Sequence, residues 1–324
     1  MGKLISVIVP AFNEEDVIEE CLTRLAEVLE TLDEDYEILI VDDGSTDSTC
    51  KIVNTFRETN PRIALLELSR NFRKEVALTA GLDHARGDAV IVIDADLQDP
   101  PELIHAFVKE WRNGYDIVYG TRTNRDGETW LKLLTARWFY RVLNAVSDVP
   151  IPTDTGDFRL MSRRAVSALI SLRETHRYMK GLYAWIGYPQ KAVPYSRHAR
   201  HAGNTKWNYW RLWNFAIEGI TSFSAVPLKL ATYLGVGASI LAFSYGTFMV
   251  ARTLLFGNPV AGYPSLIVIV LFLGGIQLTC LGIIGEYLGR IYNEAKRRSL
   301  YFVKGYHPSA TSEVDYPLTR PHPP

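Results

Sequence analysis

Two aspartates separated by one residue, Asp94 and Asp96, follow an apolar run from Ala89 to Ile93. Extended backbone turns successive side chains to opposite faces, so the two carboxylates can point the same way. Such a pair suits a hard divalent ion, Mg²⁺ or Mn²⁺, which keeps several waters and takes its remaining ligands from substrate phosphates. Acidic pairs in surface loops are commonly just solvated, but the position directly after a strand favours a metal site.

A second group of polar residues follows two earlier apolar runs. After the first run come Pro10, Asn13 and Glu15, and after the second come Asp42, Asp43, Gly44 and Ser45. Carboxylates and amides can accept hydrogen bonds from base imide and ribose hydroxyl groups. This group therefore suits a nucleoside, while a metal ion holds its diphosphate. Helix capping is the alternative for Asn13 and Ser45 taken singly, but it does not explain the whole set.

Short apolar runs alternate with amphipathic stretches through the first 120 residues, which predicts an α/β domain with a mainly parallel sheet. The expected strands are Leu4 to Val9, Tyr36 to Val41, Ile63 to Leu68, Ala89 to Ile93 and Ile117 to Tyr119. The expected helices are Glu14 to Leu32, Thr46 to Thr59, Lys74 to Ala85 and Pro101 to Arg112, with Asn13 and Ser45 as N-caps. Ligands bind beyond the carboxyl ends of such strands, where the polar residues lie together with Arg70, Asn71 and Arg122.

Composition narrows the class of protein. The 324 residues correspond to about two domains. Lys and Arg total 35 and Asp and Glu 36, a net charge of -1, so no global basic field indicates a nucleic-acid binder. The three cysteines are far apart in the sequence and have no spacing typical of a zinc site or a disulfide framework.

Two stretches near the C-terminus are long enough to cross a membrane. No charged residue lies between Lys229 and Arg252, or between Arg252 and Glu286, and each interval holds one span, near Leu230 to Val250 and Ser265 to Gly285. The connecting turn has no Lys or Arg, so the positive-inside rule predicts that both termini are cytoplasmic. Basic residues flank the outer ends of the pair, at Lys229, Arg290, Lys296, Arg297 and Arg298.

The segments around these spans have their own character. Trp207 to Phe223 holds three indoles together with Arg211 and follows Lys206, which favours an amphipathic helix in the headgroup layer over one packed on the α/β domain. The Pro-rich stretch from Pro308 to Pro324 is expected to be disordered. The run Leu4 to Val9 is too short for a signal peptide and is stopped by Pro10, so none is expected.

Five motifs resemble those of the family 2 glycosyltransferases that load sugars onto polyprenyl phosphates. They are Val7 to Glu15, Asp42 to Thr49, Asp94 to Pro101, Gly156 to Leu160 and Arg200 to Trp207. The likeness covers about residues 4 to 302. It is greatest to bacterial bactoprenyl-phosphate glucosyltransferases and weaker to dolichyl-phosphate mannose synthases. It implies a GT-A (Rossmann-like) domain, inverting transfer from a nucleotide sugar, and Mg²⁺ or Mn²⁺ as cofactor.

The resemblance also implies roles for individual residues. Asp94 and Asp96 match the metal-binding aspartates of the family, with Gln98 as their usual companion. The catalytic residues that the resemblance implies are Asp96 and Asp157. The donor side comprises Pro10, Asn13, Glu15, Asp42, Asp43, Asp94, Arg200 and Lys206, and the acceptor phosphate is assigned to Arg122 and Lys132. Asp157 stands where the family has its usual base. A phosphomonoester is already largely ionised at neutral pH, so positioning the acceptor, tuning charge, or pairing with Arg159 or another cation remain alternatives.

The resulting hypothesis is a membrane-anchored enzyme that moves a hexose, first of all glucose from UDP-glucose, onto undecaprenyl phosphate at the cytoplasmic face of the plasma membrane. GDP-mannose, UDP-galactose or a modified UDP-sugar are alternative donors, and a non-catalytic nucleotide-sugar-binding membrane protein is the alternative class. Expected units are a glycosyltransferase domain (1–205), an amphipathic juxtamembrane segment (206–228), a two-helix transmembrane hairpin (229–289) and a partly disordered cytoplasmic tail (290–324). Small residues in the spans allow close helix approach, and a homo-oligomer is expected.

Overall fold

An eight-stranded sheet, in the order β7-β5-β6-β4-β1-β2-β3-β8, forms the centre of the computed structural model. The structure describes residues 3–122, 155–195, 226–257 and 262–310. The strands are β1 (Leu4–Ala11), β2 (Asp35–Asp42), β3 (Ile63–Leu68), β4 (Ala89–Val92), β5 (Ile117–Arg122), β6 (Thr155–Ser162), β7 (Gln190–Tyr195) and β8 (Val303–His307). The central strands β4, β1, β2 and β3 are parallel, whereas β6 and β8 pair antiparallel with their neighbours.

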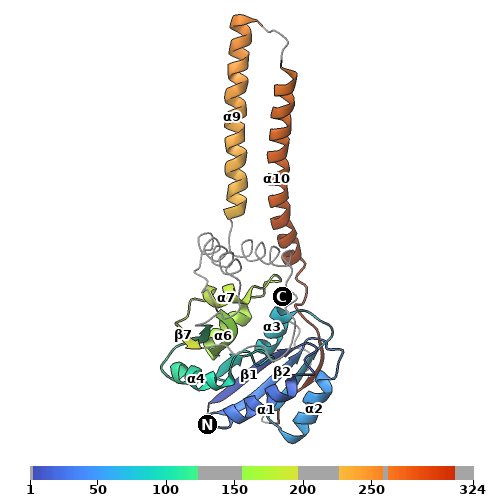
Figure 1. The fold of residues 1–324 in the computed structure, drawn as a ribbon, viewed down its shortest axis with the longest axis vertical. Helices are drawn as coiled ribbons and strands as arrows, with labels where there is room; N and C mark the ends of the chain where they lie inside the picture. The colour runs from blue at the N-terminus through green and yellow to red at the C-terminus, as the bar shows by residue number, and fades with distance from the viewer. Residues whose placement is uncertain (1–2, 123–154, 196–225, 258–261, 311–324) are drawn as a thin grey trace.

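Helices cover both faces of the sheet (Figure 1). They are α1 (Ile18–Leu29), α2 (Thr49–Thr59), α3 (Lys74–His84), the 3₁₀ turn η1 (Pro101–Leu103), α4 (Ile104–Arg112), α6 (Arg163–Ser171) and α7 (Met179–Trp185). One buried apolar cluster joins α1 and α4 to the sheet, and a second joins α3, α6 and α7 to its other face. Strands buried on both faces explain why the predicted apolar runs are nearly continuous. The predicted α/β class with a mainly parallel sheet is confirmed.

The first two helices begin later than predicted, and the predicted caps are wrong. Helix α1 starts at Ile18 and α2 at Thr49, and neither has a side-chain cap. Asn13 lies upstream of α1 in the loop after β1, and Ser45 lies upstream of α2 in the loop after β2. Instead of capping helices, their polar groups form hydrogen bonds that join the two loops to each other.

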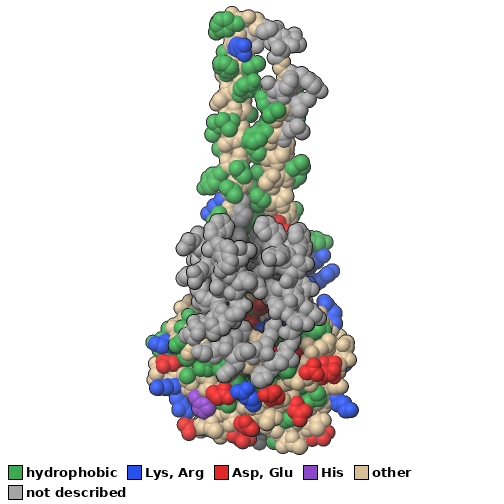
Figure 2. All heavy atoms as spheres, viewed as in Figure 1, with side chains coloured by type: hydrophobic (Ala, Val, Ile, Leu, Met, Phe, Trp, Pro, Cys, Tyr) green, Lys and Arg blue, Asp and Glu red, His purple; other side chains and the backbone are tan. Residues whose placement is uncertain are grey.

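Two long helices, α9 (Val226–Phe256) and α10 (Tyr263–Ala295), form a hairpin that stands away from the sheet (Figure 1). Their apolar spans, Leu228–Phe256 and Val268–Ala295, have mean hydropathies of 1.6 and 2.3 and are not buried within the protein. Figure 2 shows hydrophobic side chains along the hairpin, whereas charged side chains gather around the α/β part. Both helices are long and apolar enough to cross a membrane.

The end of α10 is hydrogen-bonded to the α/β domain. The Thr175 backbone N–H donates to Glu294 Oε1 at 2.6 Å, and Asn293 Nδ2 lies 3.0 Å from His176 Nε2. Beyond α10, the Tyr301 hydroxyl donates to Asp83 Oδ2 at 2.8 Å near the end of α3. Polar contacts from α10 and from the segment just after it therefore join the hairpin to the α/β domain.

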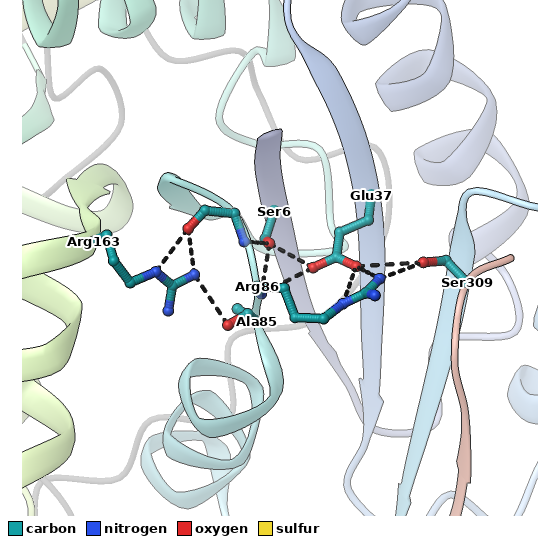
Figure 3. A network of polar contacts seen from close by, with 7 residues as sticks. Ser6, Glu37, Ala85, Arg86, Arg163 and Ser309 are labelled. Atoms are coloured by element: carbon teal, nitrogen blue, oxygen red, sulfur yellow. Dashed lines mark hydrogen bonds and ion pairs between the residues drawn. The ribbon is translucent and has the colours of Figure 1, made fainter. Parts of the chain in front are cut away.

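After the hairpin the chain returns to the sheet, where Ser309 joins a buried polar network. Strand β8 pairs antiparallel with β3, and Ser309 beyond it is 1% exposed. Ser309 contacts Arg86 and the buried Glu37 carboxylate, which also accepts from Ser6 (Figure 3). The prediction of disorder for Pro308 to Pro324 is therefore wrong for its first residues, because Ser309 is buried and the Ala310 backbone N–H donates to the Pro61 carbonyl at 2.7 Å. The remainder of the stretch lies outside the described residues.

Candidate functional site

The loops after β1 and β2 are tied to each other at the carboxyl edge of the sheet. The Asn13 backbone N–H donates to Ser45 Oγ at 2.9 Å, and Asn13 Oδ1 accepts from the Thr46 backbone N–H at 2.8 Å. Glu15 Oε2 accepts from the Ser48 backbone N–H at 2.9 Å. Asn13 takes a left-handed conformation, with φ of 54°, which a short polar side chain tolerates. These reciprocal bonds hold one continuous polar rim.

Asp42 and Asp43, each 3% exposed, bind backbone N–H groups. Asp42 accepts from the N–H groups of Gly44 and Ser45, both at 3.2 Å, and closes its own loop. Asp43 reaches the next loop along the sheet, where Oδ1 accepts from Phe72 at 2.7 Å and Oδ2 from Arg73 at 2.8 Å. Both Asp43 oxygens therefore fix the segment that leads into α3.

Gly44 lets these two loops approach closely. Its φ is 75°, and a Cβ placed there would lie 2.6 Å from the carbonyl carbon of Arg70 and 2.8 Å from the backbone nitrogen of Asn71. Backbone atoms cannot move aside as a flexible side chain can. A residue other than glycine would push the 70–73 segment away from Asp43.

Asp94 and Asp96 lie beyond β4 in a turn. Because β4 ends at Val92 and Asp96 is in the turn, strand alternation does not determine how the two carboxylates point relative to each other. They are nevertheless close: desolvation is the main cause that raises the pKa of Asp94, and the charge of Asp96 adds to it. Asp96 Oδ1 accepts from the backbone N–H of the buried Gln98 at 3.2 Å. Within the described residues no three His, Cys, Asp or Glu side chains gather as a ready metal cage.

Lys74, the first residue of α3, joins two of the acidic residues. Its Nζ lies 2.6 Å from Asp94 Oδ1, 2.8 Å from Asp94 Oδ2 and 2.6 Å from Asp157 Oδ2. Asp94 follows β4 and Asp157 lies on the neighbouring strand β6, so one ammonium connects two strands and a helix. The side chain of Asp157 is 16% exposed and that of Asp94 31%.

The charges in this cluster shift one another's pKa values. Desolvation alone would raise the pKa of Asp157, but Lys74 first, then Lys180 and Arg159, lower it to about 2. Desolvation raises the pKa of Asp94; the charge of Lys74 opposes this, and that of Asp157 adds to it. Desolvation also opposes the charge of Lys74, but the two carboxylates together raise its pKa far above the ordinary value. Asp157 is thus held as an anion.

A buried shell lies behind this cluster. The Arg159 guanidinium lies 3.5 Å from the ring centroid of Tyr183 and donates to the Gly156 carbonyl at 2.9 Å. Glu75 accepts from the Met179 backbone N–H at 3.4 Å. Desolvation and the charge of Asp157 raise the pKa of Glu75 to about 7. Asp157 pairs directly with Lys74, while Arg159 contributes through its charge and donates to backbone carbonyls, including that of Asp157.

The predicted site residues divide into three groups. Asn13, Glu15, Asp42, Asp43, Asp94, Asp96, Gln98 and Asp157 lie at or just beyond the carboxyl edge of the sheet, and Pro10 lies near the end of β1. Arg122 is the last residue of β5, and its side chain is outside the described part. Lys132, Arg200, Lys206 and the Trp207 to Phe223 segment lie outside the described residues altogether.

Sequence reasoning missed Lys74. It was counted only as the first residue of a predicted helix, although it follows the third strand at the same edge as Arg70 and Asn71. A lysine in the first turn of a helix is unfavourable for the helix dipole. That mismatch was the available signal.

Comparison with known proteins assigns this architecture to a family. Residues 6–170 match the Glycosyl transferase family 2 model, and residues 226–291 match the GtrB C-terminal hairpin. An uncharacterized glycosyltransferase of Synechocystis sp. is 54% identical over 92% of this chain and 94% of its own. The bactoprenol glucosyl transferase of Shigella phage SfII is 48% identical over 94% of this chain and 98% of its own. Among solved structures, mannosyl-3-phosphoglycerate synthase from Rubrobacter xylanophilus is 20% identical over 67% of this chain and 71% of its own, with a TM-score of 0.46.

The sheet, its carboxyl-edge acidic site and the C-terminal hairpin define a GT-A glycosyltransferase. The chain belongs to glycosyltransferase family 2, and its relatives include proteins named bactoprenol glucosyl transferase. The resemblance inferred from the five motifs is confirmed.

Proposed function

We propose that this glycosyltransferase moves a hexose from a nucleotide sugar onto a polyprenyl phosphate, with UDP-glucose and undecaprenyl phosphate as the first substrates to test. The observation that carries the proposal is the meeting of Asp94, Asp96 and Asp157 at one sheet edge, in a chain 48% identical to a bactoprenol glucosyl transferase. The proposed reaction is inverting: the phosphate oxygen attacks the anomeric carbon from the face opposite the departing nucleotide.

The donor set at Asp94 and Asp96 fits a hard divalent ion. Carboxylate oxygens are the ligands Mg²⁺ and Mn²⁺ prefer, and substrate phosphates supply others. The Lys74 ammonium at 2.6 Å from Asp94 shows that a cation is accommodated there. Asp94 and Asp96 would hold the ion with Gln98 beside them. When bound, it neutralises the charge that develops on the leaving diphosphate.

The other half of the rim suits the nucleoside. Asp42 and Glu15 accept from backbone N–H groups of the loop between β2 and α2, and this fixes the positions of their carboxylates. A carboxylate oxygen has capacity for a second hydrogen bond, such as one from a base imide or a ribose hydroxyl. We keep Pro10, Asn13, Glu15, Asp42 and Asp43 on the donor side, with Asp43 acting through the loop it holds.

Asp157 fits positioning and charge tuning better than proton abstraction. A carboxylate whose pKa is about 2 is a weak base. The acceptor phosphate loses its second proton near pH 6 and needs little help at neutral pH. Asp157 therefore fixes Lys74 and the local charge around the reacting phosphates. Arg122, Lys132, Arg200 and Lys206 remain proposed partners of the donor and acceptor phosphates.

The hairpin suits an acceptor that stays in the membrane. A lipid phosphate remains in the headgroup plane, so the active site has to be held against that plane. Helices α9 and α10 would do so with both termini in the cytoplasm, and the fastening of α10 to Thr175 would keep the domain in place. We also propose that the chain assembles as a homo-oligomer through its spans.

The test offers radiolabelled UDP-glucose, UDP-galactose and GDP-mannose, each with undecaprenyl phosphate, to the full chain in detergent with Mg²⁺ or Mn²⁺. We expect label from one donor to enter the organic phase, and NMR of the product to show an inverted anomeric centre. Undecaprenol without its phosphate is the control and should take up no label. Tight nucleotide-sugar binding without transfer from any donor would support the non-catalytic alternative and contradict the proposal.

A further inference from the structure

Lys74 occupies an unusual position for a surface lysine. Its Nζ contacts both oxygens of Asp94 and one oxygen of Asp157 within 2.8 Å. Asp94 is also a proposed metal ligand. The Lys74 ammonium would therefore compete with a divalent ion for the carboxylate oxygens of Asp94.

The backbone around Lys74 holds it there. Arg73 has a φ of 79°, a conformation that L residues rarely adopt. Asp43 stabilises this conformation, because its carboxylate accepts hydrogen bonds from the backbone N–H groups of Phe72 and Arg73. Backbone strain of this kind persists only where surrounding contacts enforce it. The loop is thus built to deliver Lys74 to the two carboxylates.

We propose that Lys74 is a positioning residue that acts as a tethered counter-cation: it holds Asp94 and Asp157 together before the metal ion binds, and it leaves Asp94 while keeping Asp157 when the ion arrives. This inference rests on the proposed function, because it assumes that Asp94 is a metal ligand. The Lys74–Asp157 contact provides the second anchor that makes such a shift short. Without Lys74, Asp94 and Asp157 would lose the ammonium that contacts both, and among the described residues only the charges of Lys180 and Arg159 would still offset Asp157.

The role predicts an effect on metal binding that precedes any chemistry. Two cations repel, so the ammonium weakens binding of the ion in the absence of substrates. Replacing Lys74 with methionine keeps a long unbranched side chain and removes the charge. Lys74→Met should tighten Mn²⁺ binding by roughly tenfold, because the repulsion between two neighbouring, part-exposed cations changes a binding constant by about that factor. Lys74→Arg keeps a cation and should bind Mn²⁺ as the wild type does.

The experiment measures Mn²⁺ binding to the full chain in detergent by electron paramagnetic resonance, first without nucleotide and then with UDP. Lys304→Met is the matched control, because Lys304 pairs with Glu67 at 3.0 Å at the far edge of the sheet. It should bind Mn²⁺ with wild-type affinity. Melting temperatures establish that each variant is folded, and Lys74→Gln, which also removes the charge, replaces Lys74→Met in the comparison if that variant does not fold.

The outcomes separate this inference from the proposed function. Tighter Mn²⁺ binding by Lys74→Met, together with wild-type binding by Lys74→Arg and Lys304→Met, supports the counter-cation. Equal Mn²⁺ affinity in wild type and Lys74→Met overturns it, as does unaltered Mn²⁺ affinity with weakened UDP binding, which would make Lys74 a phosphate ligand. Failure of the wild type to bind Mn²⁺ even with UDP would contradict the metal assignment itself.

Discussion

The two halves of the site satisfy their acidic residues in different ways. On the β1 and β2 side, Asp42, Asp43 and Glu15 accept from backbone N–H groups of the surrounding loops. On the β4 and β6 side, Asp94 and Asp157 share the ammonium of Lys74. Backbone donors cannot leave without unfolding a loop, whereas a lysine side chain can move. The first half is therefore a fixed frame, and the second can exchange its cation.

This difference predicts that the same kind of substitution has different consequences in the two halves. Loss of a carboxylate from the frame should lower stability and activity together. Loss of a carboxylate from the exchangeable half should lower activity while the fold remains. The predictions below test that distinction, beginning with the largest expected effect.

Asp43→Ala should destabilise the domain the most. It removes the acceptor of the part-buried Phe72 N–H and one of the two acceptors of the Arg73 N–H, which also donates to Asn71 Oδ1, at about 1–3 kcal/mol of unfolding free energy. Thermal or denaturant unfolding of the full chain measures the loss. Asp35→Ala is the control, because that side chain is 70% exposed and pairs only loosely with Arg62. Equal stability of the two variants would contradict the frame.

Asp157→Asn should keep the fold and lower transfer by roughly 10- to 100-fold, about 1.4–2.7 kcal/mol in the barrier. The amide cannot anchor the Lys74 ammonium as the carboxylate does. We expect the loss in kcat/KM for the acceptor to stay constant from pH 7 to 9. The measurement is kcat and acceptor KM across that range at saturating donor. A rate that recovers as the pH rises would instead make Asp157 the general base.

Glu75→Gln should change stability in a way that depends on pH and is absent at low pH. The pKa of Glu75 is about 7 in the folded chain, above its ordinary value of 4.5, because of burial and the charge of Asp157. The folded state then binds more protons than the unfolded state between these values, so wild-type stability falls as pH rises from about 4.5 to 7. The variant should lack this loss and become relatively more stable, by about 1–3 kcal/mol at pH 8. Melting temperatures from pH 5 to 8 test this, and a constant difference would contradict it.

Much of the fold could be predicted because the apolar runs report burial directly. The third predicted strand, Ile63 to Leu68, agrees with β3 residue for residue. Strand β8 escaped prediction because Val303–His307 is a short edge strand with exposed and partly buried side chains. Lys74 escaped for a related reason: its partners lie 20 and 83 residues away in sequence. Sequence motifs identify which residues lie at the carboxyl edge of the sheet. The pairing of Lys74 with Asp94 and Asp157 depends on tertiary contacts that a motif does not contain.

The most direct test of the account compares transfer by Asp96→Ala with its melting temperature. Asp96 lies in the exchangeable half and accepts only from the nearby Gln98 N–H among the contacts described, so its removal should leave the fold unaltered. We expect the melting temperature of the wild type, no measurable transfer of label to the lipid, and the same loss when excess chelator is added to the wild type. Full turnover by Asp96→Ala, or by the wild type in excess chelator, would contradict the account.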